Sequence, residues 1–356
     1  MTPKFHTLQI ADVRRETDDT ISLAFSIPHE LLEDYQYEAG QYLTLRATVD
    51  GEDIRRSYSL CSAPFENEWR VAIKQVEHGA FSSFANNKLS KGQELQVMTP
   101  MGNFKFIPEQ SKRKSILLFA AGSGITPVLA IAKTILEKET ESDVTLFYGN
   151  KGFNSIIFRE EIEAMKNRHM NRLRVVHVLS RESLGNKIQK GRIDKQKCND
   201  LFKAFLHDLT PDAAYICGPE DMIMGVKESL LENGMTADQI HFELFTASGS
   251  TTKKQVENTG AVKTIAAKMK LIVDGDEMDI NLFSGDTVLD AALNGGADLP
   301  FACKGGVCCT CKAKVVKGSV EMDVNYALEA DEVAAGYVLT CQARPTSEEL
   351  IISFDE

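Results

Sequence analysis

The sequence predicts a multi-domain fold in three parts: an antiparallel β-barrel, a doubly wound α/β domain and a small α+β domain. Three observations support this division. The first hundred residues contain short strand-like runs with glycine turns, strands then alternate with helices from about residue 115, and cysteines crowd the last quarter. A chain of 356 residues is also too long for one ordinary hydrophobic core.

Residues 1–110 are predicted to form the barrel. The strands Tyr42–Val49 and Asp53–Leu60 flank Asp50-Gly51, a dipeptide typical of a two-residue hairpin turn. Further strand-like runs are Leu8–Val13, Thr20–Ile27, Arg70–Val76 and Glu94–Met98, and the one helical stretch is Phe81–Leu89. Short strands separated by turns favour a small antiparallel barrel.

Residues 111–245 are predicted to form a parallel sheet with helices on both faces, because buried strands alternate with helical segments. The expected strands are Ser115–Ala121, Val144–Tyr148, Leu173–Leu179 and Ala214–Cys217, with helices at Pro127–Leu136 and near Ser155–Lys166.

The segment 246–264 is rich in Thr, Ser, Gly and Lys, which predicts a flexible linker. Residues 265–356 are predicted to form the α+β domain. Its expected elements are the strands Met269–Val273, Glu277–Leu282 and Lys312–Val316, and a helix from Thr287 to Asn294 that ends at Gly295-Gly296.

The overall charge and hydropathy exclude several classes of partner. The formal net charge of −11 disfavours nucleic acid, and no apolar run is long enough to span a membrane. The segment Met1–Gln9 lacks the pattern of a signal peptide, so we expect a cytoplasmic protein.

From Ile265 onward the chain has 7 Lys and Arg against 16 Asp and Glu. This acidity is either an ordinary solvated surface or a steering surface for a basic partner.

Five of the eight cysteines lie in the last 54 residues, and in a cytoplasmic protein such clustering indicates a metal rather than disulfides. The spacing Cys303-x4-Cys308-x2-Cys311, with Cys341 after 29 more residues, is that of a plant-type 2Fe-2S cluster. A zinc site would usually bring a second C-x2-C pair or paired histidines. Cys309 would break the spacing, so we interpret it as a neighbour and not a ligand.

A cluster of this kind accepts one electron at a time, whereas a nicotinamide cofactor gives up a hydride, so a flavin is expected between them. Arg56, Tyr58 and Ser59 could meet its phosphates, stack on its ring and bond its edge, although such a string alone is often plain surface. Gly79 and Ser82 open a short helix whose N–H groups could bind a pyrophosphate.

The α/β domain carries the signals for the nicotinamide cofactor. Gly122 and Gly124 form a turn at a helix start after a buried strand, which is short of a full G-x-G-x-x-G motif. Cys217-Gly218 ends another parallel strand, where ligands of such sheets bind; a buried core cysteine is the alternative. Ser180-Arg181 ends the third strand and Arg192 lies eleven residues on. Cationic groups there suit the 2′-phosphate of NADPH, whereas the adjacent Glu182 could favour NADH.

The order of the strings RSYS, GAFS, GSGITP, YGN and CGP resembles the ferredoxin–NADP reductase superfamily. The tail, with FACKGGVCCTCKAKV and LTCQ, resembles a plant-type ferredoxin domain of the β-grasp type. A reductase followed by a ferredoxin is the layout of oxygenase reductases, and the tail is most similar to those of bacterial phenylacetyl-CoA epoxygenases.

This resemblance implies electron flow from NADPH to FAD, then to the 2Fe-2S cluster and to a di-iron oxygenase that epoxidises phenylacetyl-CoA. It places Arg56, Tyr58, Ser59, Gly79 and Ser82 at FAD, and Gly122, Gly124, Thr126, Ser180, Arg181, Arg192, Cys217 and Gly218 at NADPH. Cys217, Glu243 and Thr126 would lie by the hydride path, and Cys303, Cys308, Cys311 and Cys341 would hold the cluster. His78 departs from a glycine common in the superfamily. Another oxygenase, a hybrid-cluster protein as acceptor, or a redox sensor are the alternatives.

Overall fold

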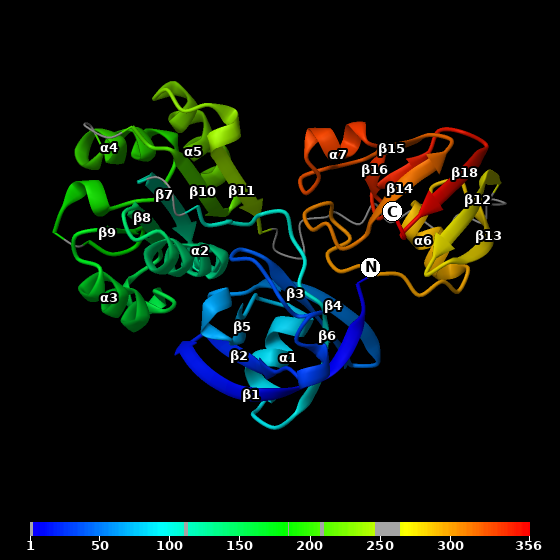
Figure 1. The fold of residues 1–356 in the computed structure, drawn as a ribbon, viewed down its shortest axis with the longest axis horizontal. Helices are drawn as coiled ribbons and strands as arrows, with labels where there is room; N and C mark the ends of the chain where they lie inside the picture. Colours follow the sequence, from blue (N-terminus) through cyan, green and yellow to red (C-terminus); the bar gives the residue numbers. More distant parts are fainter. Residues whose placement is uncertain (1–2, 110–112, 184, 207–209, 246–263) are drawn as a thin grey trace.

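The computed structural model describes residues 3–109, 113–183, 185–206, 210–245 and 264–356. The predicted linker at 246–264 lies outside these residues except for Thr264. Figure 1 shows three lobes: the barrel (blue to cyan), the α/β domain (green) and the C-terminal domain (yellow to red). The multi-domain fold class predicted from the sequence is confirmed.

The first domain is a six-stranded antiparallel sheet that curls into a barrel. The strands are β1 (Phe5–Thr17), β2 (Thr20–Ser26), β3 (Tyr42–Val49), β4 (Glu52–Ser59), β5 (Trp69–Lys74) and β6 (Glu94–Met98), in the order β4-β3-β6-β1-β2-β5. An isolated bridge between Leu60 and Val71 joins the two edges of the sheet. The helix α1 (Ala80–Lys88) buries Phe81 in the barrel core.

The β3–β4 turn has the predicted chemistry. Asp50 and Gly51 both have positive φ, +52° and +83°, as a type I′ hairpin turn requires. This turn pairs Tyr42 with Ser59 across the two strands.

The second domain is a five-stranded parallel sheet in the order β11-β10-β7-β8-β9. Its strands are β7 (Ser115–Ala121), β8 (Asp143–Asn150), β9 (Leu173–Leu179), β10 (Ala213–Gly218) and β11 (Ile240–Leu244). Its helices are α2 (Ile125–Lys138), α3 (Arg159–Arg168), α4 (Lys195–Phe205) and α5 (Glu220–Glu232). Side chains of α2 and α3 pack in one core, and those of α4 and α5 in another, so the sheet is covered on both faces.

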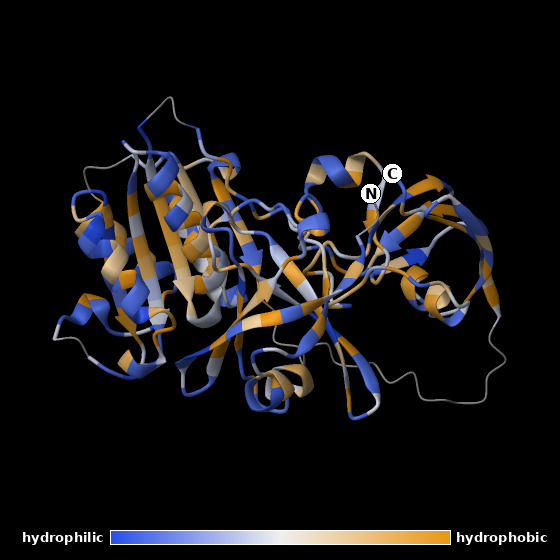
Figure 2. Ribbon diagram, turned by 60° about the horizontal axis from the view of Figure 1, so that its bottom comes forward, coloured by the Kyte–Doolittle hydropathy of each residue, from blue (hydrophilic) through white to orange (hydrophobic). Residues whose placement is uncertain are grey.

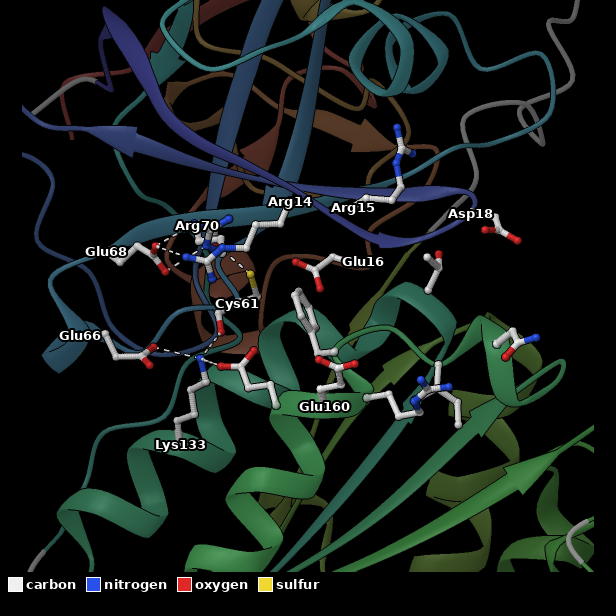
Figure 3. A pocket seen from close by; sticks show the side chains of 16 residues that line it. Arg14, Arg15, Glu16, Asp18, Cys61, Glu66, Glu68, Arg70, Lys133 and Glu160 are labelled. Carbon is white, nitrogen blue, oxygen red and sulfur yellow. Dashed lines mark hydrogen bonds and ion pairs between the residues drawn. The ribbon is translucent and has the colours of Figure 1, made fainter.

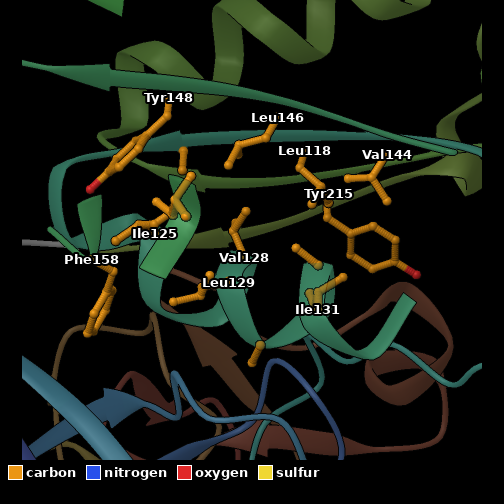
Figure 4. Packing of buried hydrophobic residues seen from close by; sticks show 14 of the residues in the cluster. Leu118, Ile125, Val128, Leu129, Ile131, Val144, Leu146, Tyr148, Phe158 and Tyr215 are labelled. Carbon is orange, nitrogen blue, oxygen red and sulfur yellow. The ribbon is translucent and has the colours of Figure 1, made fainter. Parts of the chain in front are cut away.

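The barrel and the α/β domain share a continuous hydrophobic core. Figure 4 shows Val128 of α2 pointing toward Leu118 and Leu146 of the sheet, and the same core includes Ala39 of the barrel. At the edge of this core, the Tyr215 ring lies 5.7 Å from Phe104 and 5.8 Å from Phe106, between ring centroids. Burying one such ring stabilises the fold by about 2–3 kcal/mol, so these contacts stabilise the packing of the barrel against the α/β domain.

The C-terminal domain is a mixed sheet with the helix α6 packed against it and a second, shorter helix α7, a β-grasp arrangement. The order β13-β12-β18-β14-β16 places the parallel pair β12–β18 in the centre, with antiparallel neighbours. The elements are β12 (Ile265–Val273), β13 (Asp276–Phe283), α6 (Val288–Asn294), β14 (Lys312–Lys317), β15 (Val320–Met322), α7 (Ala330–Ala334), β16 (Tyr337–Leu339), β17 (Ala343–Pro345) and β18 (Glu349–Ser353).

Hydropathy follows this architecture. In Figure 2 the central strands of the α/β sheet are mostly apolar, while the surrounding helices carry polar residues outward. In the part of the chain that the structure describes, no helix is long and apolar enough to cross a lipid bilayer.

Candidate redox site

The glycine turn after β7 and the end of β10 meet at the point where the strand order reverses. Such a switch point, at the carboxyl ends of the strands, is where open α/β sheets bind ligands. Gly122 has φ of +54°, which favours glycine. A Cβ atom on Gly124 would lie 2.2 Å from the backbone oxygen of Cys217, so only glycine allows this close approach. The Thr126 hydroxyl donates to the carbonyl of Ser123 in the first turn of α2.

The residues predicted to bind the flavin come from β4 and α1. The Tyr58 ring contacts Phe81 of α1, with 5.8 Å between the ring centroids. Gly79 precedes α1, and a Cβ atom there would lie 2.5 Å from Ser82 Oγ. The Ser82 hydroxyl donates to the Gly79 carbonyl at 3.1 Å and so shapes the turn.

Two further residues of the predicted flavin region, His78 and Arg56, have defined backbone conformations or contacts. His78 has φ of +59°, so it keeps the left-handed backbone that glycine would favour at that position. Arg56 donates to the backbone carbonyl of Arg55 at 2.7 Å.

Glu243 joins the barrel to the α/β domain. The Ser59 hydroxyl donates to its carboxylate at 3.0 Å. Within the sheet, Glu243 on β11 stands opposite Cys217 on β10. Loss of hydration raises the pKa of the Glu243 carboxyl to about 8, against an ordinary value of 4.5, and the hydrogen bond from Ser59 opposes this shift. Burial likewise raises the pKa of the Cys217 thiol. A buried carboxyl group and a buried thiol therefore lie on neighbouring strands at this edge.

These residues fit a flavin and a nicotinamide cofactor. Gly79 and Gly124 stand where a Cβ atom would collide with neighbouring atoms, and the Tyr58 ring contacts Phe81 in the helix that follows Gly79. When bound, the two cofactors supply hydride transfer and its splitting into single electrons. The chain contributes the cradle, and the Ser59–Glu243 contact sets the barrel against the α/β domain.

The predicted 2′-phosphate residues lie beyond the end of β9. Leu179 forms a parallel bridge with Lys190, which brings the segment of Arg192 beside Ser180 and Arg181. Arg181 lines a hollow of about 220 Å³. Glu182 lines it too, but its carboxylate accepts from the backbone N–H of Phe153 at 2.9 Å. The acid that could favour NADH is thus already bound by a neighbouring loop.

The cluster cysteines form two pairs. The Cys308 thiol lies 3.1 Å from Cys303 Sγ and donates to it, which lowers the pKa of Cys303 to about 6. Cys311 donates to Cys341 in the same way and lowers the pKa of Cys341. A 2Fe-2S cluster takes two thiolates on each iron. Two adjacent pairs of cysteines are therefore the donor set that such a cluster needs. Among the residues described, no three or more His, Cys, Asp or Glu side chains are grouped so that they could hold a single metal ion.

The loop around these sulfurs is shaped by backbone groups. The N–H of Gly305 donates to Cys303 Sγ at 3.3 Å. Gly306 has φ of +74°, and a Cβ atom there would lie 3.0 Å from the Val324 carbonyl. The Cys309 sulfur points elsewhere, toward the hydroxyl of Tyr42 on the barrel, 3.3 Å away.

The sequence did not predict the contacts that dock the C-terminal domain. Besides Tyr42, Arg55 on β4 donates to the Leu299 carbonyl at 3.0 Å, and its guanidinium lies 4.1 Å from the Phe301 ring centroid. Val307 of the cluster loop packs against the α/β core. Neither Tyr42 nor Arg55 belongs to a recognisable motif, so no local signal could have identified them.

A hollow of about 770 Å³ lies between the barrel and the α/β domain, away from the predicted residues (Figure 3). Its walls carry paired charges. Lys133 of α2 contacts the carboxylates of Glu66 and Glu161, and Arg70 contacts that of Glu68. Of these ion pairs, Lys133–Glu66 joins the α/β domain to the barrel, at a distance from the predicted redox residues.

Comparison with known proteins agrees with the three-part organisation. Three family models match: an oxidoreductase FAD-binding domain at residues 7–106, an oxidoreductase NAD-binding domain at 118–228 and a 2Fe-2S iron-sulfur cluster binding domain at 271–346. These matches define the class: the chain is an oxidoreductase that belongs to the flavin-dependent ferredoxin reductase superfamily, with a C-terminal 2Fe-2S ferredoxin domain.

Individual proteins are similar to this chain over nearly its whole length. The chain is 42% identical to a component of the 1,2-phenylacetyl-CoA epoxidase of Escherichia coli K12, over 99% of this chain and 98% of that protein. It is 34% identical to the ferredoxin reductase component of 3-ketosteroid-9-alpha-monooxygenase of Rhodococcus rhodochrous, over 98% and 96%. The solved structure of phthalate dioxygenase reductase has the same fold, with a TM-score of 0.58, 22% identity and 98% of each chain covered.

Proposed function

We propose that this chain is an NADPH-dependent reductase that passes electrons through FAD and a 2Fe-2S cluster to the di-iron oxygenase of a multicomponent system. One observation carries the proposal. Ser59 and Tyr42 are paired across one hairpin; Ser59 contacts Glu243 on the α/β domain, and Tyr42 contacts the cluster loop. A single element thus adjoins all three predicted cofactor regions, as serial electron transfer requires.

Each group of residues has a distinct task in this proposal. Tyr58 stacks on the flavin, Ser59 bonds its edge, and Arg56 with the Gly79–Ser82 turn meets the phosphates. Gly122, Gly124 and Thr126 bind the dinucleotide, and Cys217, Gly218 and Glu243 surround the nicotinamide. No covalent nucleophile is needed, since the chain acts by holding the groups close together and excluding water.

The preference for NADPH rests on charge. Arg181 and Arg192 stand near the end of β9, and the backbone N–H of Phe153 engages the competing carboxylate of Glu182. A 2′-phosphate would therefore meet cations, while the loop of Phe153 holds the Glu182 carboxylate.

The partner is inferred from the relatives and from charge. Identity of 42% over almost the whole chain supports a phenylacetyl-CoA epoxidising oxygenase as the acceptor. The acidic surface of the C-terminal domain would attract a basic face of that oxygenase and so guide the encounter of the two proteins. The second candidate is a different oxygenase, because the 3-ketosteroid monooxygenase component is also similar over nearly the full length. We place the protein in the cytoplasm.

The first experiment is anaerobic titration of the purified holoprotein with NADPH and, separately, NADH. Flavin and cluster absorption should both bleach, and NADPH should act at the lower concentration. A holoprotein without flavin would refute the proposal. In Cys303→Ser only the flavin bands should bleach, whereas Cys198→Ser, a buried thiol in the α/β core, should behave as wild type. Steady ferricyanide reduction would exclude a pure sensor.

The second experiment identifies the acceptor. Purified oxygenase components, phenylacetyl-CoA and NADPH are combined with the reductase, and the oxygenated product is measured. Product formation supports the phenylacetyl-CoA system. Bleaching of both cofactors without product would assign the chain to another oxygenase.

A further inference from the structure

Tyr42 is a buried contact between the barrel and the cluster loop. Its side chain is only 4% exposed and belongs to the hydrophobic core of the C-terminal domain, although it stands on β3 of the barrel. Its hydroxyl lies 3.3 Å from Cys309 Sγ and 3.1 Å from Thr310 Oγ1. These two residues separate the predicted cluster ligands Cys308 and Cys311.

The backbone of Tyr42 is fixed on the other side. Its N–H donates to the Met101 carbonyl at 2.8 Å, and its carbonyl accepts from the Met101 N–H at 3.0 Å. Its partner across the hairpin is Ser59, the residue that contacts Glu243. Tyr42 therefore connects a rigid part of the predicted flavin region to the loop between two cluster ligands.

We propose that the Tyr42 hydroxyl positions the cluster loop for the electron step from the flavin to the cluster. The inference rests on the proposed function and adds a residue to it. Two hydrogen bonds from one fixed ring define how near the loop sits to the hairpin, and electron transfer between held groups depends on that proximity. Tyr42 is a positioning residue and takes no part in hydride transfer.

The electron step balances with the proposed cofactors alone. With both groups bound, one electron would pass from the reduced flavin to one ferric ion of the cluster, which would become ferrous. The oxygenase or, in the assay, ferricyanide would reoxidise the cluster. Two such transfers would account for the two electrons of one hydride, restore the oxidised flavin and release one proton to solvent.

The test compares Tyr42→Phe with wild-type holoprotein. Rapid mixing with NADPH separates flavin reduction, followed by absorption, from cluster reduction, followed by the electron paramagnetic resonance of the reduced cluster. We expect cluster reduction to slow about tenfold, which corresponds to about 1.4 kcal/mol, while flavin reduction stays within about twofold of wild type. Hydrogen exchange of the resting holoprotein should be faster at residues 306–311, and this readout requires no turnover.

Two further variants control the interpretation. Tyr37→Phe removes another buried barrel hydroxyl, one bonded to Ser62 and to the Glu68 carbonyl, and should leave both phases and the exchange unchanged. In a double-mutant cycle, Tyr42→Phe should slow cluster reduction less in the Cys309→Ala background than in wild type, because one of its two partners is already gone.

Several results would overturn the inference: unchanged cluster reduction in Tyr42→Phe, equal slowing of both phases, or additive effects in the cycle. Failure of the proposed function looks different. In that case NADPH would not reduce the wild-type flavin, while faster exchange at residues 306–311 in Tyr42→Phe would still report the docking contact.

Discussion

The contact between Arg55 of the barrel and the C-terminal domain can be tested directly by mutation. Its side chain is 4% exposed, donates to the Leu299 carbonyl at 3.0 Å and lies 3.6 Å from the Asp298 carboxylate. Its guanidinium stacks on Phe301, two residues before the predicted ligand Cys303. Arg55→Met retains much of the aliphatic volume and removes the charge and the donors.

The magnitude follows from these contacts. A hydrogen bond from a charged group contributes about 1.5–3 kcal/mol, and a desolvated cation–π contact about 2 kcal/mol. Burial opposes them, since loss of hydration lowers the pKa of Arg55. The net loss of docking free energy should be about 2–4 kcal/mol, or roughly 30- to 1,000-fold in the docking equilibrium.

The assay is hydrogen exchange of residues 297–304 in the holoprotein, because amides protected by docking exchange through its opening. Arg55→Met should accelerate exchange there by that factor. The matched control is Arg46→Met, which removes an arginine paired with Asp53 on the same hairpin and should change little. Exchange in Arg55→Met within about twofold of wild type would refute the assignment of Arg55 as a docking residue.

Four further predictions test the proposed path. Cys341→Ser should abolish cluster reduction and delivery to the oxygenase while flavin-dependent ferricyanide reduction persists; loss of both activities would contradict it. Arg181→Ala should raise KM for NADPH about 10- to 100-fold and KM for NADH far less, and equal effects would reverse the cofactor preference. Glu243 binds a proton more tightly in the fold than when unfolded, so its contribution to stability declines as pH rises from about 4.5 to 8. Glu243→Gln should therefore gain in Tm relative to wild type between pH 5 and 8; a constant difference would contradict the shifted pKa. Turnover with the oxygenase should fall at high ionic strength, because salt screens the acidic domain; no change would remove the steering role.

Much of the fold was predictable because its signals are local. The strands β6, β7 and β9 have the predicted bounds. β1 runs from Phe5 to Thr17, well beyond the predicted Leu8–Val13, because its polar end pairs with β2 through backbone bonds that hydropathy does not report. The strand β11 was missed, although the alternation of Ile240, Phe242 and Leu244 with two polar residues is a strand pattern.

Helix bounds differed for identifiable reasons. The helix α2 begins at Ile125 and not at the predicted Pro127, because proline is tolerated in a first turn, where its missing N–H costs nothing. The helix predicted near Ser155–Lys166 begins only at Arg159. Phe158, the residue before this helix, has a left-handed backbone with φ of +60°, which a continuous helix does not allow.

The candidate site divides in the same way. Residues in motifs, such as the cluster cysteines and Gly124, can be proposed from the sequence because their chemistry needs a fixed spacing along the chain, and their roles stay predictions. Tyr42 and Arg55 could not, because their partners lie about 245–270 positions away in sequence. Their sequence surroundings are those of an ordinary strand.

The hairpin β3–β4 nevertheless shows how a local signal determines a distant contact. Opposed residues of antiparallel strands share a face, and residues alternate between faces along a strand. Tyr42 stands opposite Ser59, and Arg55 lies four residues before Ser59, so all three side chains occupy one face. The neighbouring Leu43 and Ile54 occupy the other and fill the barrel core.

The register of this hairpin therefore determines the whole junction. It is set by the Asp50-Gly51 turn, whose positive φ values suit a two-residue connection. A slip of one residue would turn Tyr42 and Arg55 toward the barrel core and expose apolar side chains in their place. Because apolar burial on one face opposes that slip, the same pattern that folds the barrel also holds the docking residues toward the C-terminal domain. The two-residue turn is thus the sequence feature on which the proposed electron path depends.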